Sequence, residues 1–194
     1  MTDTFAILDF ETTGMSPDSG AYPTEIAIVL VRHGQITDRY QSLMNSNTRI
    51  PAFIESLAGI TNAMIRKAPP MQQVMGEAIE FAGDYPLVAH NAAFDSKFWD
   101  AALARQHKQR QQHFLCTLLL SRRVFPHAPN HKLGTLVNFL NLPNTGQFHR
   151  ALADAEATSH LFIRMQDILQ NKFKLPELNC QKLLSVQRQK IGTL

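Results

Sequence analysis

Short apolar runs dominate the first ninety residues, and each has the length and pattern of a β-strand. Residues 5–10 form an apolar run that ends in acidic residues, which is typical of a buried strand. Residues 25–32 and 36–44 predict two further strands, and the intervening His33-Gly34-Gln35 suits a hairpin. A shorter run at 87–89 predicts another strand.

Helical patterns cover most of the remaining chain. Asn91 is a good N-cap for a helix at 92–105, and 151–169 predicts a final long helix with an apolar stripe. Further helices are expected at 53–57, 61–66, 71–82, 115–124 and 132–140. Strands joined by short turns, followed by helices that alternate with short strands, predict an α/β domain with a mixed sheet and helices packed on it.

Composition narrows the class of protein. An apolar content of 44% with 18% charged residues indicates a folded protein. No apolar run approaches the roughly 20 residues that span a bilayer, and the N-terminus lacks a basic segment followed by an apolar one. The two cysteines are too few for a disulfide framework. We therefore expect a cytoplasmic protein that does not associate with membranes.

The net charge of +3 is unevenly distributed. Residues 171–194 carry five Lys and Arg against one Glu, so this segment has a charge of +4 and the remaining chain has −1. We expect one domain at 1–170 and a basic C-terminal tail at 171–194. The basic tail is compatible with contact to a polyanion, and equally with a solvated helix or terminus.

Two acidic residues end the first predicted strand. Asp9 and Glu11 are two positions apart, so they share one face of the strand while Phe10 points to the other. Neighbouring carboxylates repel each other, and a cation between them removes that cost. Oxygen ligands favour Mg²⁺ or Mn²⁺ over zinc. Taken alone, the pair is also compatible with solvated or capping side chains.

A further acidic residue, Asp95, lies at the junction between a predicted strand and the helix that follows it. Asp95 falls in the first helical turn, where a carboxylate gains about 0.3–1 kcal/mol from the helix dipole even without a further role. Phe94 and Phe98 share the inner face of this helix, which indicates a core position for Phe94. His90 is expected to be a hydrogen-bonded structural histidine.

The last long helix begins near His149 and Asp154. Five residues of helix turn through about 500°, so both side chains can serve one site only if His149 lies in the loop before the helix. A histidine beside an attacking water suits a general base, because imidazole ordinarily titrates near neutrality. In isolation, this segment is also compatible with a surface histidine before a helix.

Taken together, three motifs resemble the exonuclease family called DEDDh, which includes the proofreading epsilon subunit of bacterial DNA polymerase III and ribonuclease T. They are Asp-x-Glu-Thr-Thr-Gly at 9–14, His-Asn-x-x-Phe-Asp at 90–95 and His-Arg-Ala-x-x-Asp-Ala at 149–155. The segments 59–61 and 131–136 add weaker similarity. The resemblance covers about residues 4–170 and implies a ribonuclease-H-like fold, with a mixed five-stranded sheet flanked by helices.

The resemblance also implies the chemistry, which is 3′→5′ removal of nucleoside 5′-monophosphates. Two Mg²⁺ or Mn²⁺ ions, about 3.5–4 Å apart, would clamp the attacking and departing oxygens. The metal ligands would be Asp9, Glu11, Asp95 and Asp154, and these four residues with His149 as general base would form the catalytic set. The substrate-binding residues would be Phe10, Thr12, Gly14, Asn91 and Phe94.

The sequence is compatible with more than one substrate and with a non-catalytic role. The partner is the 3′ end of a nucleic acid; single-stranded DNA is favoured, and an exoribonuclease is the alternative. A non-catalytic nucleic-acid-binding or polymerase-associated module is a further hypothesis, although none of the required carboxylates is missing. The short tail gives no support for association with a polymerase. Many relatives have His where this chain has Ala58, so the contact of that position with the terminal nucleotide is open.

Overall fold

The computed structural model of the protein, which describes residues 4–143, 149–175 and 178–193, contains one mixed sheet. The strand order is β3-β2-β1-β4-β5. Strands β1, β2 and β3 pair antiparallel, whereas β4 runs parallel to β1 and β5 runs parallel to β4. The bounds are Thr4–Thr12 for β1, Pro23–Arg32 for β2, Gln35–Leu43 for β3, Leu87–Ala89 for β4 and Phe114–Cys116 for β5. The predicted α/β class with a mixed five-stranded sheet is confirmed.

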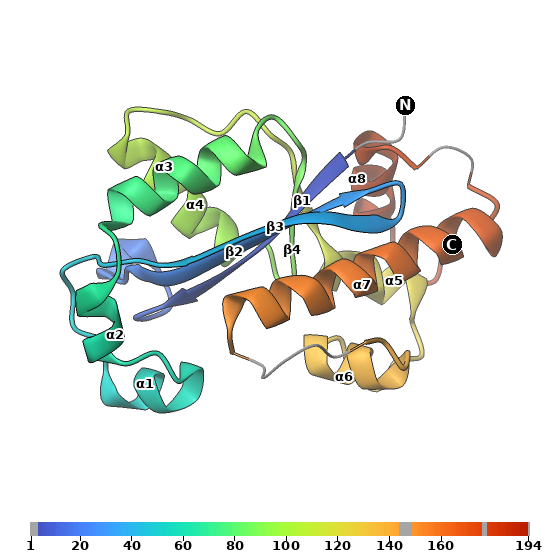
Figure 1. Cartoon of the computed structure of the whole chain (residues 1–194). Helices are drawn as coiled ribbons and strands as arrows, with labels where there is room; N and C mark the ends of the chain where they lie inside the picture. The colour runs from blue at the N-terminus through green and yellow to red at the C-terminus, as the bar shows by residue number, and fades with distance from the viewer. Residues whose placement is uncertain (1–3, 144–148, 176–177, 194) are drawn as a thin grey trace.

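Helices cover both faces of this sheet (Figure 1). Helices α3 and α4 lie on one face, and the long α7, with α5 and α8, lies on the other. The bounds are Ala52–Ala58 for α1, Asn62–Lys67 for α2, Met71–Ala82 for α3, Asp95–Arg105 for α4, Thr117–Val124 for α5, Leu133–Phe139 for α6, Ala151–Asn171 for α7 and Cys180–Arg188 for α8. A short 3₁₀ helix at Pro17–Ser19 follows β1.

Two predicted boundaries are wrong. Asn91 does not cap α4, because it adopts a left-handed φ of 67° in a turn and the helix begins four residues later, at Asp95. The segment 115–124 is not one helix, because residues 114–116 pair with β4 as strand β5 before α5 begins. A run of apolar residues does not distinguish a buried strand from a buried helix, and pairing with a distant strand decides the outcome here.

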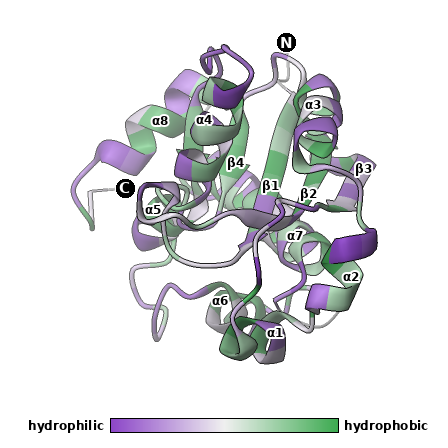
Figure 2. Cartoon of the chain, turned by 90° about the vertical axis from the view of Figure 1, so that its left-hand side faces the viewer, coloured by the Kyte–Doolittle hydropathy of each residue, from purple (hydrophilic) through white to green (hydrophobic). Residues whose placement is uncertain are grey.

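Alternating side chains of β1 supply two separate cores. Phe5 and Ile7 pack with α7 on one face, while Leu8 and Phe10 pack with α3 and α4 on the other. The hydropathy colouring shows the apolar character of the central strands and of the helix faces near them (Figure 2). Because Asp9 continues the odd-numbered series, it faces the α7 side near the end of the strand.

The segment predicted as a basic tail contains helix α8. Its residues Leu183, Leu184 and Val186 are buried in the core that α7 covers. The side chain of Gln187 accepts a hydrogen bond from the backbone of Cys116 at 3.0 Å, which ties α8 to β5. Within the described ranges of the chain, no helix combines the length and the apolar character needed to cross a membrane.

Candidate active site

The end of β1 places two carboxylates on the α7 side of the sheet. Asp9 and Glu11 follow Phe5 and Ile7 on the same strand face, and Glu11 lies opposite Glu25 of β2 in the register. Both are partly exposed, in contrast to the fully buried apolar residues before them. The predicted shared face therefore forms at the point where the strand leaves the core.

Asp95 reaches the same place from the other layer. It is the first residue of α4, and the whole residue is only 2% exposed. The backbone N–H of Phe10 donates a hydrogen bond to Asp95 Oδ1 at 3.3 Å. This bond joins the start of α4 to the position on β1 between Asp9 and Glu11.

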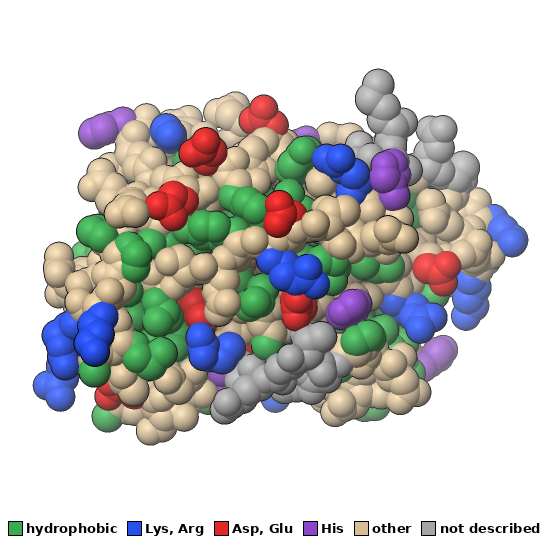
Figure 3. All heavy atoms as spheres, in the orientation of Figure 1, with side chains coloured by type: hydrophobic (Ala, Val, Ile, Leu, Met, Phe, Trp, Pro, Cys, Tyr) green, Lys and Arg blue, Asp and Glu red, His purple; other side chains and the backbone are tan. Residues whose placement is uncertain are grey.

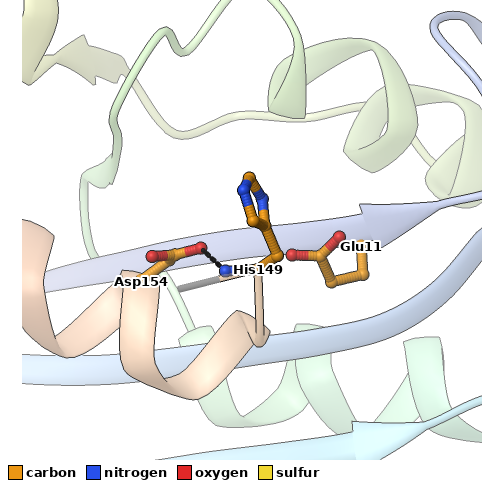
Figure 4. Close-up of side chains that lie close together, drawn as sticks. All are labelled: Glu11, His149 and Asp154. Atoms are coloured by element: carbon orange, nitrogen blue, oxygen red, sulfur yellow. Dashed lines mark hydrogen bonds between the residues drawn. The ribbon is translucent and has the colours of Figure 1, made fainter. Parts of the chain in front are cut away.

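His149 and Asp154 complete the group from the start of α7. His149 has a left-handed φ of 66° and precedes the helix, so it lies outside the helical repeat. Its backbone N–H donates to Asp154 Oδ2 at 3.0 Å. One ligand atom from each of Glu11, His149 and Asp154 lies within 4.8 Å of the others. The close-up shows the three side chains beside one another, Glu11 from β1 and the other two from the start of α7 (Figure 4). The structure thus brings together side chains that are more than a hundred residues apart.

Burial raises the pKa of all four carboxylates, and repulsion by neighbouring carboxylates adds to the shift at Asp9, Glu11 and Asp95. Burial is the largest cause for Asp9, whose pKa lies well above its usual value, and the charges of Asp95, Asp154 and Glu11 raise it further. Burial and the charge of Asp154 raise the pKa of Glu11 to about 7. Burial raises the pKa of Asp95 to about 8, although the N–H of Phe10 opposes this shift. Burial also raises the pKa of Asp154.

The donor set fits divalent cations. Asp154 Oδ1 is buried, and no hydrogen-bond donor for it is found in the described part of the chain. A buried oxygen without a donor is costly unless something else contacts it. Carboxylate oxygens that repel one another are the ligands that Mg²⁺ and Mn²⁺ prefer. A cation among these carboxylates would satisfy this oxygen and offset the repulsion.

An open cleft of about 550 Å³ leads to the carboxylates. Asp9, His149 and Asp154 line one side, and residues of α6 with the preceding Lys132 line the other. The space-filling view shows acidic, basic and histidine side chains spread among apolar ones over one face of the molecule (Figure 3). A solvent-accessible cleft with charged groups on its walls suits a polar, charged substrate.

His90 lines this cleft as a structural residue, as expected from the sequence. Its Nδ1 lies 2.9 Å from Thr117 Oγ1, and its Nε2 lies 2.9 Å from the carbonyl oxygen of His131. Burial lowers its pKa to about 4, so the ring is neutral at pH 7. His90 connects the end of β4 to the segment that forms the opposite wall.

The five predicted substrate-binding residues occupy different environments. The side chain of Phe10 is buried, and only its backbone reaches the carboxylates, through Asp95. Phe94 is partly buried, with its ring centroid 5.0 Å from that of Phe98, whereas Asn91 is exposed. Thr12 is buried and donates to the carbonyl of Gly14 at 2.7 Å. Thr12 and Gly14 therefore form a structured turn directly after the carboxylate pair.

Ala58 lies outside this arrangement. Its side chain is 4% exposed and packs in a small core with Ile50, Ile60 and Ile65. Two earlier apolar residues of α1, Phe53 and Leu57, are exposed to solvent. The position before Gly59 is thus part of a local core in this chain.

Sequence reasoning missed one charged residue beside the site. Glu25 was assigned only to a strand, yet its carboxylate is fully buried and binds Arg150, which directly follows His149. The local pattern gave one signal, because an acidic residue at the start of an otherwise apolar strand is unusual in a core. Its partner lies 125 residues away, so no local pattern identifies it.

Comparisons with known proteins show which family the chain belongs to. The sequence profile of the family described as "Exonuclease" matches residues 6–162. DNA polymerase III PolC-type of Bacillus cereus is 37% identical over 176 residues, which cover 89% of this chain and 12% of that protein. The 3′-5′ exonuclease DinG of Bacillus subtilis is 37% identical over 191 residues, which cover 98% of this chain and 20% of that protein. The chain thus spans between about a tenth and a fifth of these relatives.

Solved structures share the fold. Exonuclease X in complex with 5′ overhanging duplex DNA superposes with a TM-score of 0.73 at 24% identity, covering 94% of this chain and 99% of that one. The nuclease domain of 3′hExo, a DEDDh member bound to rAMP, gives a TM-score of 0.73 at 22% identity, covering 92% and 97%. At these identities the likeness establishes the architecture.

Proposed function

The chain belongs to the exonuclease family, and from this membership we propose that it removes nucleotides from the 3′ end of single-stranded DNA. The observation that carries the proposal is the convergence of Glu11, His149 and Asp154 within 4.8 Å of one another, beside Asp9 and Asp95. The products are nucleoside 5′-monophosphates and a strand that is one nucleotide shorter.

Divalent cations are the cofactor that fits this arrangement. Asp9, Glu11, Asp95 and Asp154 would hold two Mg²⁺ or Mn²⁺ ions, with Asp154 Oδ1 as an oxygen that still lacks a partner. When bound, the ions neutralise charge on the phosphate and on the departing oxygen. The raised pKa values of Glu11 and Asp95 support this assignment, because a cation removes the repulsion that contributes to them.

The residues of the chain then act on water and phosphate. His149 takes a proton from the water whose oxygen attacks the terminal phosphorus. The bond from phosphorus to the 3′-oxygen of the penultimate nucleotide breaks, and that oxygen gains a proton from solvent. The hydrogen bond from the His149 backbone to Asp154 holds the base close to the carboxylates. Lys132, on the opposite wall of the cleft, faces the substrate as a counter-charge to phosphate.

DNA is proposed over RNA because relatives with 36–37% identity include DNA polymerase III PolC-type proteins and the DinG exonuclease. Both substrates undergo the same hydrolysis, and only contacts at the 2′-position separate them. Digestion of matched DNA and RNA oligonucleotides, side by side, decides between them. Faster shortening of the RNA would reverse the assignment without changing the mechanism.

A labelled oligonucleotide tests the activity itself. With a 5′ label and Mg²⁺, we expect a ladder that shortens by one nucleotide at a time, and excess EDTA should stop it. Asp9→Ala serves as the control for contaminating nucleases. Activity that survives this substitution, or a substrate that stays intact with Mg²⁺ and Mn²⁺, would contradict the proposal and favour a non-catalytic binding module.

A further inference from the structure

Glu25 is a buried carboxylate that the proposed reaction does not use. It accepts hydrogen bonds from Arg150 Nε at 3.1 Å and Arg150 Nη2 at 2.8 Å. The backbone N–H of Ala151 donates at 3.1 Å, and Gln41 Nε2 donates at 2.7 Å. A charge is retained in such a place only when partners of this kind surround it.

These contacts fix the start of helix α7. The N–H of Ala151 belongs to the first helical turn, whose donors have no partner inside the helix. The N-cap residue, Arg150, makes no capping hydrogen bond with its own side chain. Glu25 of strand β2 supplies the acceptor instead. The strand thus holds the first residue of a helix that begins 126 residues later.

The residues so held lie between two members of the active site. His149 directly precedes Arg150, and Asp154 follows Ala151 within the first turn of α7. Glu25 itself lies opposite Glu11 in the pairing of β1 with β2. One carboxylate therefore links the strand position of Glu11 to the backbone that carries His149 and Asp154.

Stability alone does not explain a charge at this position. An apolar pair of similar volume often stabilises a core as well as a buried ion pair does, or better. Glu25 also adds negative charge to a region that already holds four carboxylates, which opposes their ionisation. The carboxylate fixes the orientation of the Arg150 guanidinium and of the first turn of α7. An apolar side chain would not do this.

We propose that Glu25 is a positioning residue of the active site, which acts through Arg150 and Ala151 to set His149 and Asp154 relative to Glu11. The proposal rests on the exonuclease activity proposed above for its kinetic readout. It assigns Glu25 no contact with substrate or metal.

Glu25→Gln tests the positioning. The amide keeps the size of the side chain but turns an N–H group toward the donors of Arg150 or Ala151. We expect kcat with Mg²⁺ to fall about 10–100-fold, as for other residues that orient a metal site, while KM for a long oligonucleotide changes little. Arg150→Gln should have a similar effect, and the double variant should be no slower than the slower single variant, because both substitutions disrupt the same Glu25–Arg150 ion pair.

Val29→Ala is the matched control. Val29 is fully buried on the same strand, in the core that α7 covers, and it pairs with Ile7 away from the cleft. Its truncation should lower Tm by several degrees, on the order of 5 °C, and leave kcat of the folded protein unchanged. Equal losses of kcat in Val29→Ala and Glu25→Gln would reduce Glu25 to a stabilising residue and overturn the proposal.

Amide hydrogen exchange of the metal-free protein gives a second readout. In Glu25→Gln, the Ala151 amide should exchange at least tenfold faster, while amides near Leu161 in the middle of α7 keep their rates. Unchanged exchange at Ala151, or additive kinetic effects of the two single variants, would overturn the positioning role. If Glu25→Gln does not fold, Arg150→Gln carries the kinetic measurement, because the Arg150 side chain is 36% exposed and the hydrogen bond from Ala151 to Glu25 stays in place.

Failure of the two proposals is distinguishable. A wild-type protein without nuclease activity would overturn the proposed function, and exchange at Ala151 would still decide whether Glu25 holds α7. An active wild-type protein with an equally active Glu25→Gln variant would overturn only the positioning role.

Discussion

Two clefts lie at opposite ends of β1 and α7. One, of about 400 Å³, lies between the start of β1 at Phe5, the hairpin at His33 and the later turns of α7, which include Asp167. The other, of about 550 Å³, lies between Asp9 near the end of β1 and the first turn of α7, which contains Asp154. The same two elements thus line two hollows of similar size.

The clefts differ in how their charged groups are held. Asp167 accepts a hydrogen bond from Asn171 of the next helical turn at 2.6 Å, as a surface side chain does. Asp154 instead lies among Asp9, Glu11 and Asp95, with one buried oxygen that lacks a donor among the described residues. Convergence of carboxylates from three elements, rather than volume, therefore distinguishes the cleft at which we propose the reaction.

The largest contrast is expected from removing one carboxylate at each end of α7. Asp154→Asn should lower kcat by about 10³-fold or more, because a metal ligand supports several kcal/mol of transition-state stabilisation. Asp167→Asn, on the same helix, should keep wild-type activity. Single-turnover rates with Mg²⁺ measure both, and comparable losses in the two variants would abolish the distinction between the clefts.

A histidine exists at each end as well, and both adopt a left-handed backbone conformation. Asparagine tolerates that conformation, so His149→Asn and His33→Asn remove the imidazole with little backbone strain. His149→Asn should lower kcat about 10²-fold while the Mg²⁺ concentration for half-maximal rate changes little, because a base acts on the proton and the carboxylates hold the ions. His33→Asn should keep the wild-type kcat.

A Mg²⁺ titration of His149→Asn separates the two roles. If metal affinity fell as far as the rate, His149 would have to be reassigned as a ligand rather than a base.

The stability of the metal-free protein should depend on pH, because the clustered carboxylates Glu11 and Asp95 have raised pKa values. The folded pKa values of Glu11 and Asp95, about 7 and about 8, exceed the usual 4.5 and 3.8, so between pH 4 and 8 the folded state binds more protons than the unfolded state. Stability therefore falls as pH rises through that window. We expect Tm in EDTA to drop on the order of 5 °C between pH 5 and 8, and Mg²⁺ to restore it at pH 8.

Asp154→Asn provides the control for this measurement. Because it removes a charge that raises the pKa of both Asp9 and Glu11, the pH dependence of Tm should become shallower. A metal-free Tm that is flat from pH 5 to 8 would contradict the repulsion inferred at this cleft.

The smallest effect is expected from the basic wall of the carboxylate cleft. Lys132→Ala should raise KM for a long oligonucleotide a few-fold and reduce the salt dependence of binding by about one counterion, with kcat nearly unchanged. Lys132→Arg should retain wild-type KM. Fluorescence anisotropy across a salt series measures the slope, and an unaltered slope in Lys132→Ala would remove Lys132 from the substrate path.

Local sequence order was enough to predict much of this molecule. The period of two in a strand placed Asp9 and Glu11 on one face, and the angle between helical residues required His149 to precede α7, which it does. The motifs predicted the family, which the profile match confirms. The boundaries of β4 and α3 were also predicted as observed, since both are bounded by strong turn residues.

Tertiary structure decided what depends on distant partners. Strand β5 exists because residues 114–116 pair with β4, and Asn91 forms a turn because α4 begins at Asp95, where the Phe10 N–H meets its carboxylate. The sequence by itself determined which chemical groups the protein carries and which strand face or helix end bears each of them. Only the folded chain decided that Glu25 binds Arg150, because hydrogen bonds across 125 residues follow from packing and leave no periodic trace in the sequence.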